Sequence, residues 1–309
     1  MKNNMEKRNV KDLIFGFVVG DALGVPVEFA ERDYLTKRPV TTMIDGGIHL
    51  QKPGTWSDDS SMTFCLMESM IEGYNILDLS LRFQNWMYQN YWAPHGENFD
   101  IGITTSCAIQ NLLYGADPSK SGLSTENSKG NGSLMRISPI IFYSKNLDIA
   151  DRYDLIKELT IITHNTDLCI DCGFFYTEFI LNLIETKDKF NAFHLTKFNT
   201  EKFLIDKDKF KRIFDNSFTN LSKDEIKSSG YVLDTLEASL WTFLNYDSYS
   251  DIVLNAVNLG DDTDTVAALA GGLAGIFYGY EFISNDWINS LADLDKINDL
   301  ILRFENKFF

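Results

Sequence analysis

Two groups of acidic residues near opposite ends of the chain have the composition of a metal site. They are Ser57-Asp58-Asp59 and Asp261-Asp262-Thr263-Asp264-Thr265, each at a predicted helix start. Carboxylates held together repel each other, by roughly 4 kcal/mol per pair at about 4 Å with an effective dielectric of about 20. Divalent cations such as Mg²⁺ and Mn²⁺ relieve this repulsion and prefer carboxylate, hydroxyl and water oxygens. The two groups together predict one site for hard divalent cations.

Each acidic group also has a purely structural explanation. Ser57 is a suitable N-cap and acidic residues in a first turn complement the helix dipole, so the first group alone is explained better as a helix start. Capping does not require three aspartates and a threonine in five positions. Asp262 and Asp264 can converge in a turn, as alternate ligands do in calcium-binding loops, and Thr265 adds a neutral oxygen. The alternative for the second group is an acidic loop on an acidic protein.

Three other features are candidates for ligand binding. Gly130-Asn131-Gly132-Ser133 can direct backbone N–H groups at a phosphate, although such a sequence is as often only a turn. Glu28 follows a stretch of small residues from Gly16 to Gly24, which helix packing explains, whereas Glu28 itself is not explained by packing. His164 is interpreted from composition as a helix C-terminal cation rather than a site residue. The remaining histidines, His49, His95 and His194, receive no predicted role.

The charge of the chain limits the classes of partner. A formal net charge of -16 over 309 residues argues against nucleic acid or an anionic membrane, because both require a basic surface. The polar N-terminus, residues 1–8, lacks the apolar stretch of a secretory signal, and no apolar run approaches the ~20 residues of a membrane span. We therefore expect a cytoplasmic protein. Cys169 and Cys172 lack the second close pair of a zinc site and are interpreted as packed core cysteines.

Helical periodicity dominates the sequence and predicts an all-α fold. Apolar residues recur at i, i+3 and i+4 in eight segments: Val10–Ala22, Ser60–Tyr74, Leu77–Tyr91, Ile101–Tyr114, Ile149–Thr163, Cys169–Glu185, Leu233–Leu244 and Val266–Tyr280. Only residues 40–50 suggest a small hairpin or irregular connection, and residues 115–132 resemble a loop. A shared acidic site requires the first and last thirds of the chain to pack together, so residues 1–309 are expected to form a single domain.

The sequence resembles the ADP-ribosylglycohydrolase family in six motifs that occur in the family's order. The resemblance spans most of the chain and rests on Gly20–Glu28, Thr55–Ser60, Asp100–Gly102, Gly130–Arg136, Thr163–His164 and Asn258–Thr265. Residues 229–279 are similar to the bacterial branch that includes the dinitrogenase reductase-activating glycohydrolase. The resemblance implies a compact orthogonal helical bundle with a binuclear Mg²⁺ or Mn²⁺ centre at the base of an ADP-ribose cleft.

The resemblance also implies roles for individual residues. The metal ligands would be Ser57, Asp58, Asp59, Asp262, Asp264 and Thr265. Glu28 matches a carboxylate on a mobile segment at the cleft, and Asp100 and Gly102 match a motif on the ribose side. The diphosphate loop would be Gly130, Asn131, Gly132 and Ser133, with Tyr231 in the pocket wall. His164 matches a histidine that recurs in the family. With this resemblance, a role facing the site and a purely structural role are equally expected for His164.

The implied activity is metal-dependent hydrolysis that removes ADP-ribose from a modified acceptor, with arginine-linked protein as the first expectation. Asp58 or Asp59 would accept the proton of water, and Glu28 or Asp100 would assist the leaving group. The substrate would be an ADP-ribosylated protein or a small-molecule conjugate, and the protein is expected to be a monomer. The alternative is an immunity or regulatory protein that binds ADP-ribose and occludes an ADP-ribosyltransferase antagonist. The interpretation of Asp262-x-Asp264 as a phosphatase motif is disfavoured because no β-strand is predicted before it.

Overall fold

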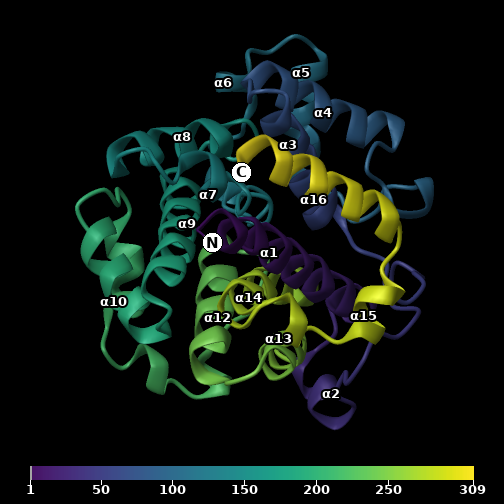
Figure 1. Ribbon diagram of the computed structural model, residues 1–309, viewed down its shortest axis with the longest axis vertical. Helices are drawn as coiled ribbons and strands as arrows, with labels where there is room; N and C mark the ends of the chain where they lie inside the picture. The colour runs from purple at the N-terminus through teal and green to yellow at the C-terminus, as the bar shows by residue number, and fades with distance from the viewer. Residues whose placement is uncertain (1) are drawn as a thin grey trace.

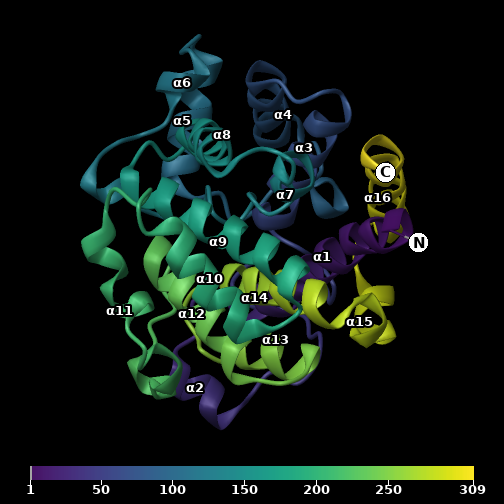
Figure 2. The same cartoon turned by 60° about the vertical axis from the view of Figure 1, so that its left-hand side comes forward.

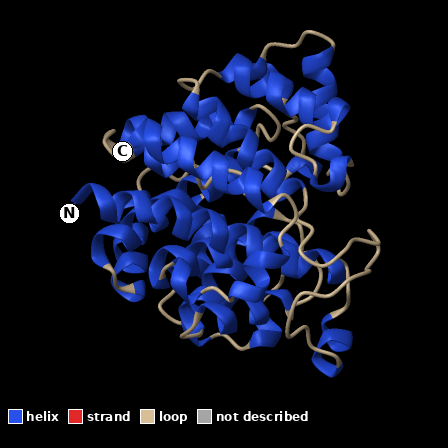
Figure 3. Cartoon of the chain, turned by 45° about the vertical axis from the view of Figure 1, so that its right-hand side comes forward, coloured by secondary structure: helices blue, strands red, loops and turns tan. Residues whose placement is uncertain are grey.

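The computed structural model describes residues 2–309, with side chains from Val10 onward, and it consists of helices joined by loops (Figure 1, Figure 3). No β-strand occurs among these described residues, and pairing of strand type is limited to isolated bridges such as Gly46 with Gln51. The predicted all-α class is therefore confirmed. No described helix is both long enough and apolar enough to cross a bilayer.

The α-helices of the described chain are α1 (Lys2–Gly24), α2 (Arg32–Lys37), α3 (Asp58–Ile71), α4 (Ile76–Gln89), α5 (Ile103–Leu113), α6 (Pro118–Ser121), α7 (Ile140–Ser144), α8 (Ile149–Ile161), α9 (Asp167–Thr186), α10 (Lys189–Thr200), α11 (Lys211–Phe214), α12 (Val232–Asn245), α13 (Tyr249–Val257), α14 (Thr263–Tyr278), α15 (Asn285–Ser290) and α16 (Leu294–Phe308). Short 3-10 turns occur at Val25–Val27, Pro94–Gly96, Glu126–Ser128, Lys207–Phe210, Phe218–Asn220, Lys223–Glu225 and Tyr280–Phe282.

All eight periodic segments correspond to helices, and their ends are shifted by a few residues except in α1, which begins at Lys2 rather than Val10. The segment 115–132 is not entirely a loop, because Asp117 caps the short helix α6 by accepting a hydrogen bond from the Ser119 amide at 2.9 Å. Residues 46–51 form a turn closed by one bridge rather than a hairpin with two strands. Cys169 and Cys172 are buried free thiols, as expected for packed core cysteines.

Helices α1 and α14 cross the centre of the molecule side by side, with their backbones in contact (Figure 1). A Cβ atom on Gly16 would lie 2.4 Å from the Gly271 carbonyl oxygen, and one on Gly20 would lie 2.1 Å from the Ala267 carbonyl oxygen. The two helices can therefore approach this closely only because Gly16 and Gly20 lack side chains. Tyr249 strengthens it by donating a hydrogen bond from its hydroxyl to the Gly16 carbonyl at 2.8 Å.

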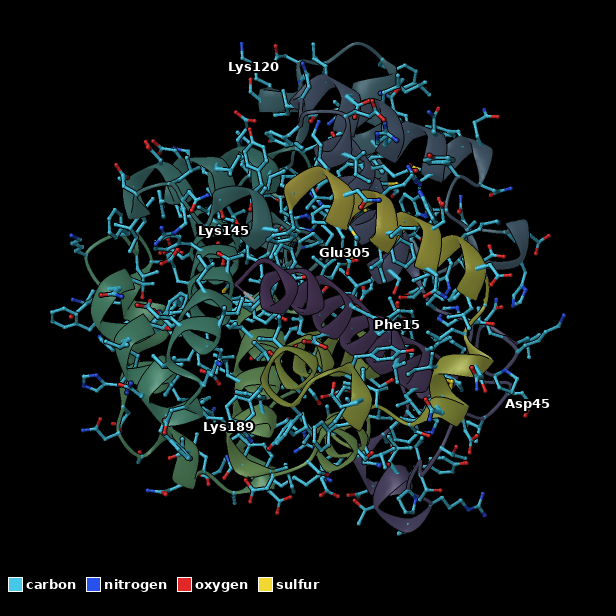
Figure 4. All side chains as sticks on the ribbon, in the orientation of Figure 1. Phe15, Asp45, Lys120, Lys145, Lys189 and Glu305 are labelled. Atoms are coloured by element: carbon cyan, nitrogen blue, oxygen red, sulfur yellow. The ribbon has the colours of Figure 1, made fainter. Side chains whose placement is uncertain are left out.

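The other helices pack around this central pair. Helices α9, α12 and α13 contact α14, while α3 and α16 contact α1 (Figure 2). Phe15 illustrates the packing of α1: its ring is buried in the centre of the molecule and lies 5.0 Å from the ring of Tyr280 (Figure 4). The surrounding helices thus enclose a pair whose geometry is set by glycine.

Three helix ends meet at one end of the central pair. Gly24, the last residue of α1, is so close to the start of α14 that an added Cβ would lie 2.3 Å from the Asp264 Cα. Asp21, fully buried on α1, accepts hydrogen bonds from the backbone N–H groups of Ser57 and Ser60 at 2.9 and 3.2 Å. The carboxylate of α1 therefore fixes the start of α3 beside the start of α14.

We expect Gly20→Ala to lower the free energy of unfolding by about 3 kcal/mol, the upper end of overpacking costs, because backbone atoms of α14 must move away. Denaturant titration measures this change. Gly173→Ala on α9 is the matched control, since its Cβ would meet side-chain atoms rather than backbone, namely Ile156 Cγ2 at 3.3 Å and Thr160 Oγ1 at 3.7 Å. The control should change stability by less than about 1 kcal/mol. Equal losses in both variants would contradict the importance of the α1–α14 contact.

Candidate metal centre and ligand cleft

The two acidic groups meet where α3 and α14 begin. Asp58 and Asp59 occupy the first turn of α3, and Asp264 and Thr265 the first turn of α14. The Thr265 hydroxyl donates to Asp59 Oδ1 at 3.4 Å, across 206 positions of sequence. The structure thus brings together the residues that the sequence predicted to share one site.

Several oxygen atoms of this cluster lack hydrogen-bond partners. Among the buried side-chain atoms of the described chain, Asp59 Oδ2, Asp262 Oδ1 and Asp264 Oδ2 accept no hydrogen bond. An unpartnered buried polar group costs about 1–3 kcal/mol, and more if it is charged, so three in one place require a compensating ligand. Because all three are carboxylate oxygens, the residues present fit a hard divalent cation such as Mg²⁺ or Mn²⁺.

Burial raises the pKa values of the acidic residues at this site. The pKa values of Asp58, Asp59 and Asp264 lie well above the ordinary value because these carboxyls are buried and face the negative charges of nearby carboxyls, including Asp100 and Asp262. Burial also raises the pKa of Asp21 to about 6, despite its hydrogen bonds from Ser60 and Ser57. A bound cation would favour the ionised forms and reverse these shifts.

Ser57 acts in the structure as the N-cap of α3, accepting a hydrogen bond from the Asp59 amide at 3.3 Å. Its side chain is buried but does not line the cleft described below. The structural explanation of Ser57 as a cap is therefore correct, and its predicted contribution to metal binding stays a prediction.

A cleft of about 250 Å³ opens above the acidic cluster. It is lined by Glu28, Phe29, Asp58, Asp59, Asp100, Gly102, Ile103, Thr104, Thr105, Gly130, Asn131, Gly132, Met135, His164, Gly230, Asp262 and Thr265. Eleven predicted site residues are in this lining, whereas Ser57, Ser133, Tyr231 and Asp264 are outside it. Tyr231 instead forms an isolated bridge through its backbone with Gly130.

The glycine-rich segment is joined directly to the acidic cluster. Asn131 donates from its Nδ2 to Asp262 Oδ2 at 2.9 Å and to Thr235 Oγ1 at 3.0 Å. Gly132 lies against the His164 ring, since an added Cβ would be 2.8 Å from its Cε1. A side chain at Gly132 would therefore displace the wall of the cleft.

His164 is a buried cleft residue rather than an exposed helix cation. Its Nδ1 lies 2.8 Å from Thr163 Oγ1, and burial together with the Arg136 charge lowers its pKa to about 3. Arg136 itself is buried and donates to Thr163 Oγ1 at 2.8 Å and to the carbonyls of Gly132 and Leu159. The imidazole is therefore neutral, and Arg136 supports the wall behind it.

Glu28, Asp100 and His49 form a second polar group beside the acidic cluster. His49 Nε2 is 2.6 Å from Glu28 Oε2 and 3.8 Å from Asp100 Oδ1. Burial and the charge of Asp100 raise the pKa of Glu28 to about 10, and burial and Asp262 raise the pKa of Asp100 to about 6. No local pattern in the sequence sets His49 apart, and only the folded chain brings its turn to Glu28.

The cleft is strongly acidic. Five of its lining residues are carboxylic acids, and the described lining contains no lysine or arginine. Its single imidazole, His164, is held neutral. The cleft therefore offers a negative environment that favours cations, and an anionic ligand requires bound metal or backbone N–H groups.

Comparison with known proteins identifies the family of the chain and relatives of its fold. The sequence pattern of the ADP-ribosylglycohydrolase family matches residues 1–308, so the chain belongs to that family. ADP-ribosylarginine hydrolase Tri1 of Serratia proteamaculans is 37% identical, over 94% of this chain and 77% of the relative. The ADP-ribosyl-[dinitrogen reductase] glycohydrolase of Rhodospirillum rubrum is 26% identical, over 89% of this chain and 87% of the relative. The solved structure of an ADP-ribosylglycohydrolase-related protein complex superposes with a TM-score of 0.84 at 26% identity, and the match covers 99% of this chain and 100% of the solved chain.

Asp264→Asn should weaken binding of Mn²⁺ by at least about tenfold, because it removes one anionic oxygen donor. Without metal the same variant should be more stable than the unmodified protein, since it removes a buried charge. Calorimetric titration with Mn²⁺ and thermal unfolding in EDTA measure the two effects. Asp261→Asn is the control, because Asp261 is exposed and asparagine tolerates its φ of 57°. Equal metal affinity in both variants would exclude Asp264 as a ligand.

The stabilisation by divalent cations should depend on pH. Asp21 and Asp100 have folded pKa values of about 6, above their ordinary 3.8, so their contribution to stability is present below 3.8 and is lost as the pH rises through 6. We expect Mg²⁺ or Mn²⁺ to raise the melting temperature more at about pH 7.5 than at about pH 5, because ionised carboxylates bind cations. Differential scanning calorimetry with and without EDTA measures this, and a pH-independent rise would contradict it.

Proposed function

We propose that this protein is a divalent-cation-dependent hydrolase that releases ADP-ribose from arginine side chains of modified proteins. The observation that carries the proposal is the set of unpartnered carboxylate oxygens on Asp59, Asp262 and Asp264 at the base of an acidic cleft. Membership of the ADP-ribosylglycohydrolase family and the similarity to two ADP-ribosylarginine hydrolases, at 37% and 30% identity, support the same reaction.

The charge of the cleft supports an arginine acceptor over a neutral one. An arginine-linked conjugate brings a guanidinium beside the anomeric carbon, and the carboxyls of Glu28 and Asp100 line the cleft. A guanidinium beside these carboxyls would favour their ionised forms and pair with them through charge-assisted hydrogen bonds. The diphosphate, being anionic, would contact the backbone N–H groups of Gly130 and Gly132, where no side-chain bulk intervenes, since the Asn131 N–H already donates to the Gly230 carbonyl at 3.0 Å.

The metal ligands proposed for this site are Asp58, Asp59, Asp262, Asp264 and Thr265. Bound cations would supply polarisation of water and of ribose hydroxyls. In the reaction, water adds to the anomeric carbon and its proton passes to Asp58 or Asp59, while the anomeric C–N bond breaks and its electron pair remains on the guanidine nitrogen. Both aspartates line the cleft, where either carboxylate can accept this proton.

A protein that only occludes an ADP-ribosylating partner is the alternative. Such a protein does not need unpartnered carboxylates at the base of a cleft, because each costs stability without aiding the contact. The retained donor set therefore favours a hydrolase, and direct protection against a partner remains compatible with it.

Purified protein with Mg²⁺ or Mn²⁺ should release ADP-ribose from arginine-linked conjugates at least about tenfold faster than from serine-linked conjugates, because only arginine supplies a positive charge. Mass spectrometry of released ADP-ribose measures both rates. Asp262→Ala should reduce the arginine reaction by at least about a hundredfold through loss of metal, with Asp261→Asn as the control. Tight binding of ADP-ribose without release from either conjugate would exclude the hydrolase and favour occlusion.

A further inference from the structure

His49 lies on a turn that rests against the segment leading to Glu28. The turn, residues 46–51, is closed by hydrogen bonds between Gly46 and Gln51 at 2.8 and 3.1 Å. Its Gly47 fits directly over Pro26, since an added Cβ would lie 2.3 Å from the Pro26 carbonyl oxygen. The turn is thus placed by close backbone contact two residues before Glu28.

The His49 imidazole lies against two other segments of the chain, one at Glu28 and one at residues 99–100. Besides its contacts with Glu28 at 2.6 Å and Asp100 at 3.8 Å, its ring lies 5.0 Å from the Phe99 ring. The side chain is only 13% exposed, so its position is fixed by these neighbours. One side chain therefore holds the segment at Glu28 and the segment at Asp100 next to each other.

The segments that contain Glu28 and Asp100 each include a residue with an unfavourable backbone conformation, which needs support from its surroundings. Phe29 has a φ of 61° and Asp100 a φ of 56°, both in the left-handed region that non-glycine residues rarely adopt. The Phe29 amide is held by the Asp261 carbonyl at 2.7 Å, at the start of α14. Its ring is 60% exposed at the cleft, where it offers an aromatic face beside the two carboxyls.

We propose that His49 is a positioning residue that holds Glu28 and Asp100 together as the recognition site for the cationic acceptor group. This inference rests on the proposed function. Two carboxyls fixed side by side match the paired N–H donors of a guanidinium, and the Phe29 ring provides a face on which such a group stacks. Without His49 the two carboxyls lose the imidazole that lies against both of them. Ordering them on binding then weakens affinity for the acceptor.

The test compares the affinity for an arginine-linked ADP-ribose conjugate with the affinity for free ADP-ribose, which lacks the acceptor. In His49→Ala, KM for an arginine-linked conjugate should rise about tenfold while kcat changes by less than about twofold, because ground-state binding is lost. The Kd for free ADP-ribose should stay unchanged, since it has no guanidinium. His49→Gln should restore KM to within about threefold, because the amide replaces the hydrogen bond at Nε2. His194→Gln, on the exposed face of α10, is the control.

Three outcomes would overturn the proposal. An unchanged KM in His49→Ala would show that the contact does not matter, and an equal loss of ADP-ribose affinity would indicate collapse of the cleft. A higher Mn²⁺ requirement would make His49 a metal ligand, since ligand atoms of Glu28, His49 and Asp100 lie within 4.8 Å of one another.

A failure of the proposed function is recognised separately. If the unmodified protein does not release ADP-ribose from the arginine conjugate, the proposed reaction fails. Calorimetric Kd values for the intact conjugate then replace KM in the same comparison. The positioning role is supported if His49→Ala binds the conjugate more weakly than the unmodified protein does, while its affinity for free ADP-ribose is unchanged. Equal binding of the conjugate by His49→Ala and the unmodified protein overturns it.

Discussion

The contact between α1 and α14 is the constraint on which the rest of the structure depends. Their backbones touch at Gly16, Gly20 and Gly24, so residues from both ends of the chain share one line of contact. This contact carries Asp21 to the start of α3 and places Asp264 beside the end of α1. The acidic cluster therefore follows from helix packing, and any residue that separates the two helices also separates the two acidic groups.

The site concentrates negative charge where the fold can least solvate it. Asp58, Asp59 and Asp264 are buried, and their pKa values are raised by burial and by mutual repulsion. A folded protein tolerates such a cluster only with a compensating ligand or with protons bound. The stability of this protein and its proposed chemistry are thus coupled through the same oxygens, and the metal that would support catalysis would also support the fold.

Much of the fold was predictable because long amphipathic helices have a clear period. The helices that were not predicted are mostly short, such as α11 and α15, where one turn carries too few apolar residues to show a pattern. Helix α16 differs, since Ile297, Leu300, Ile301 and Phe304 do have helical spacing and are buried, so its signal was present in the sequence. The turn at residues 46–51 was not resolved because backbone contact with Pro26 determines its shape.

The sequence by itself determined the all-α class, the two acidic groups and the ligand types they offer, because these depend on residue chemistry and local spacing. Only the tertiary structure decided how those residues are used. It made Ser57 a cap, held His164 neutral beside Arg136, and brought His49 to Glu28 and Asp100. Such roles arise from contacts between residues distant in the chain and from burial, and neither is encoded in a local pattern.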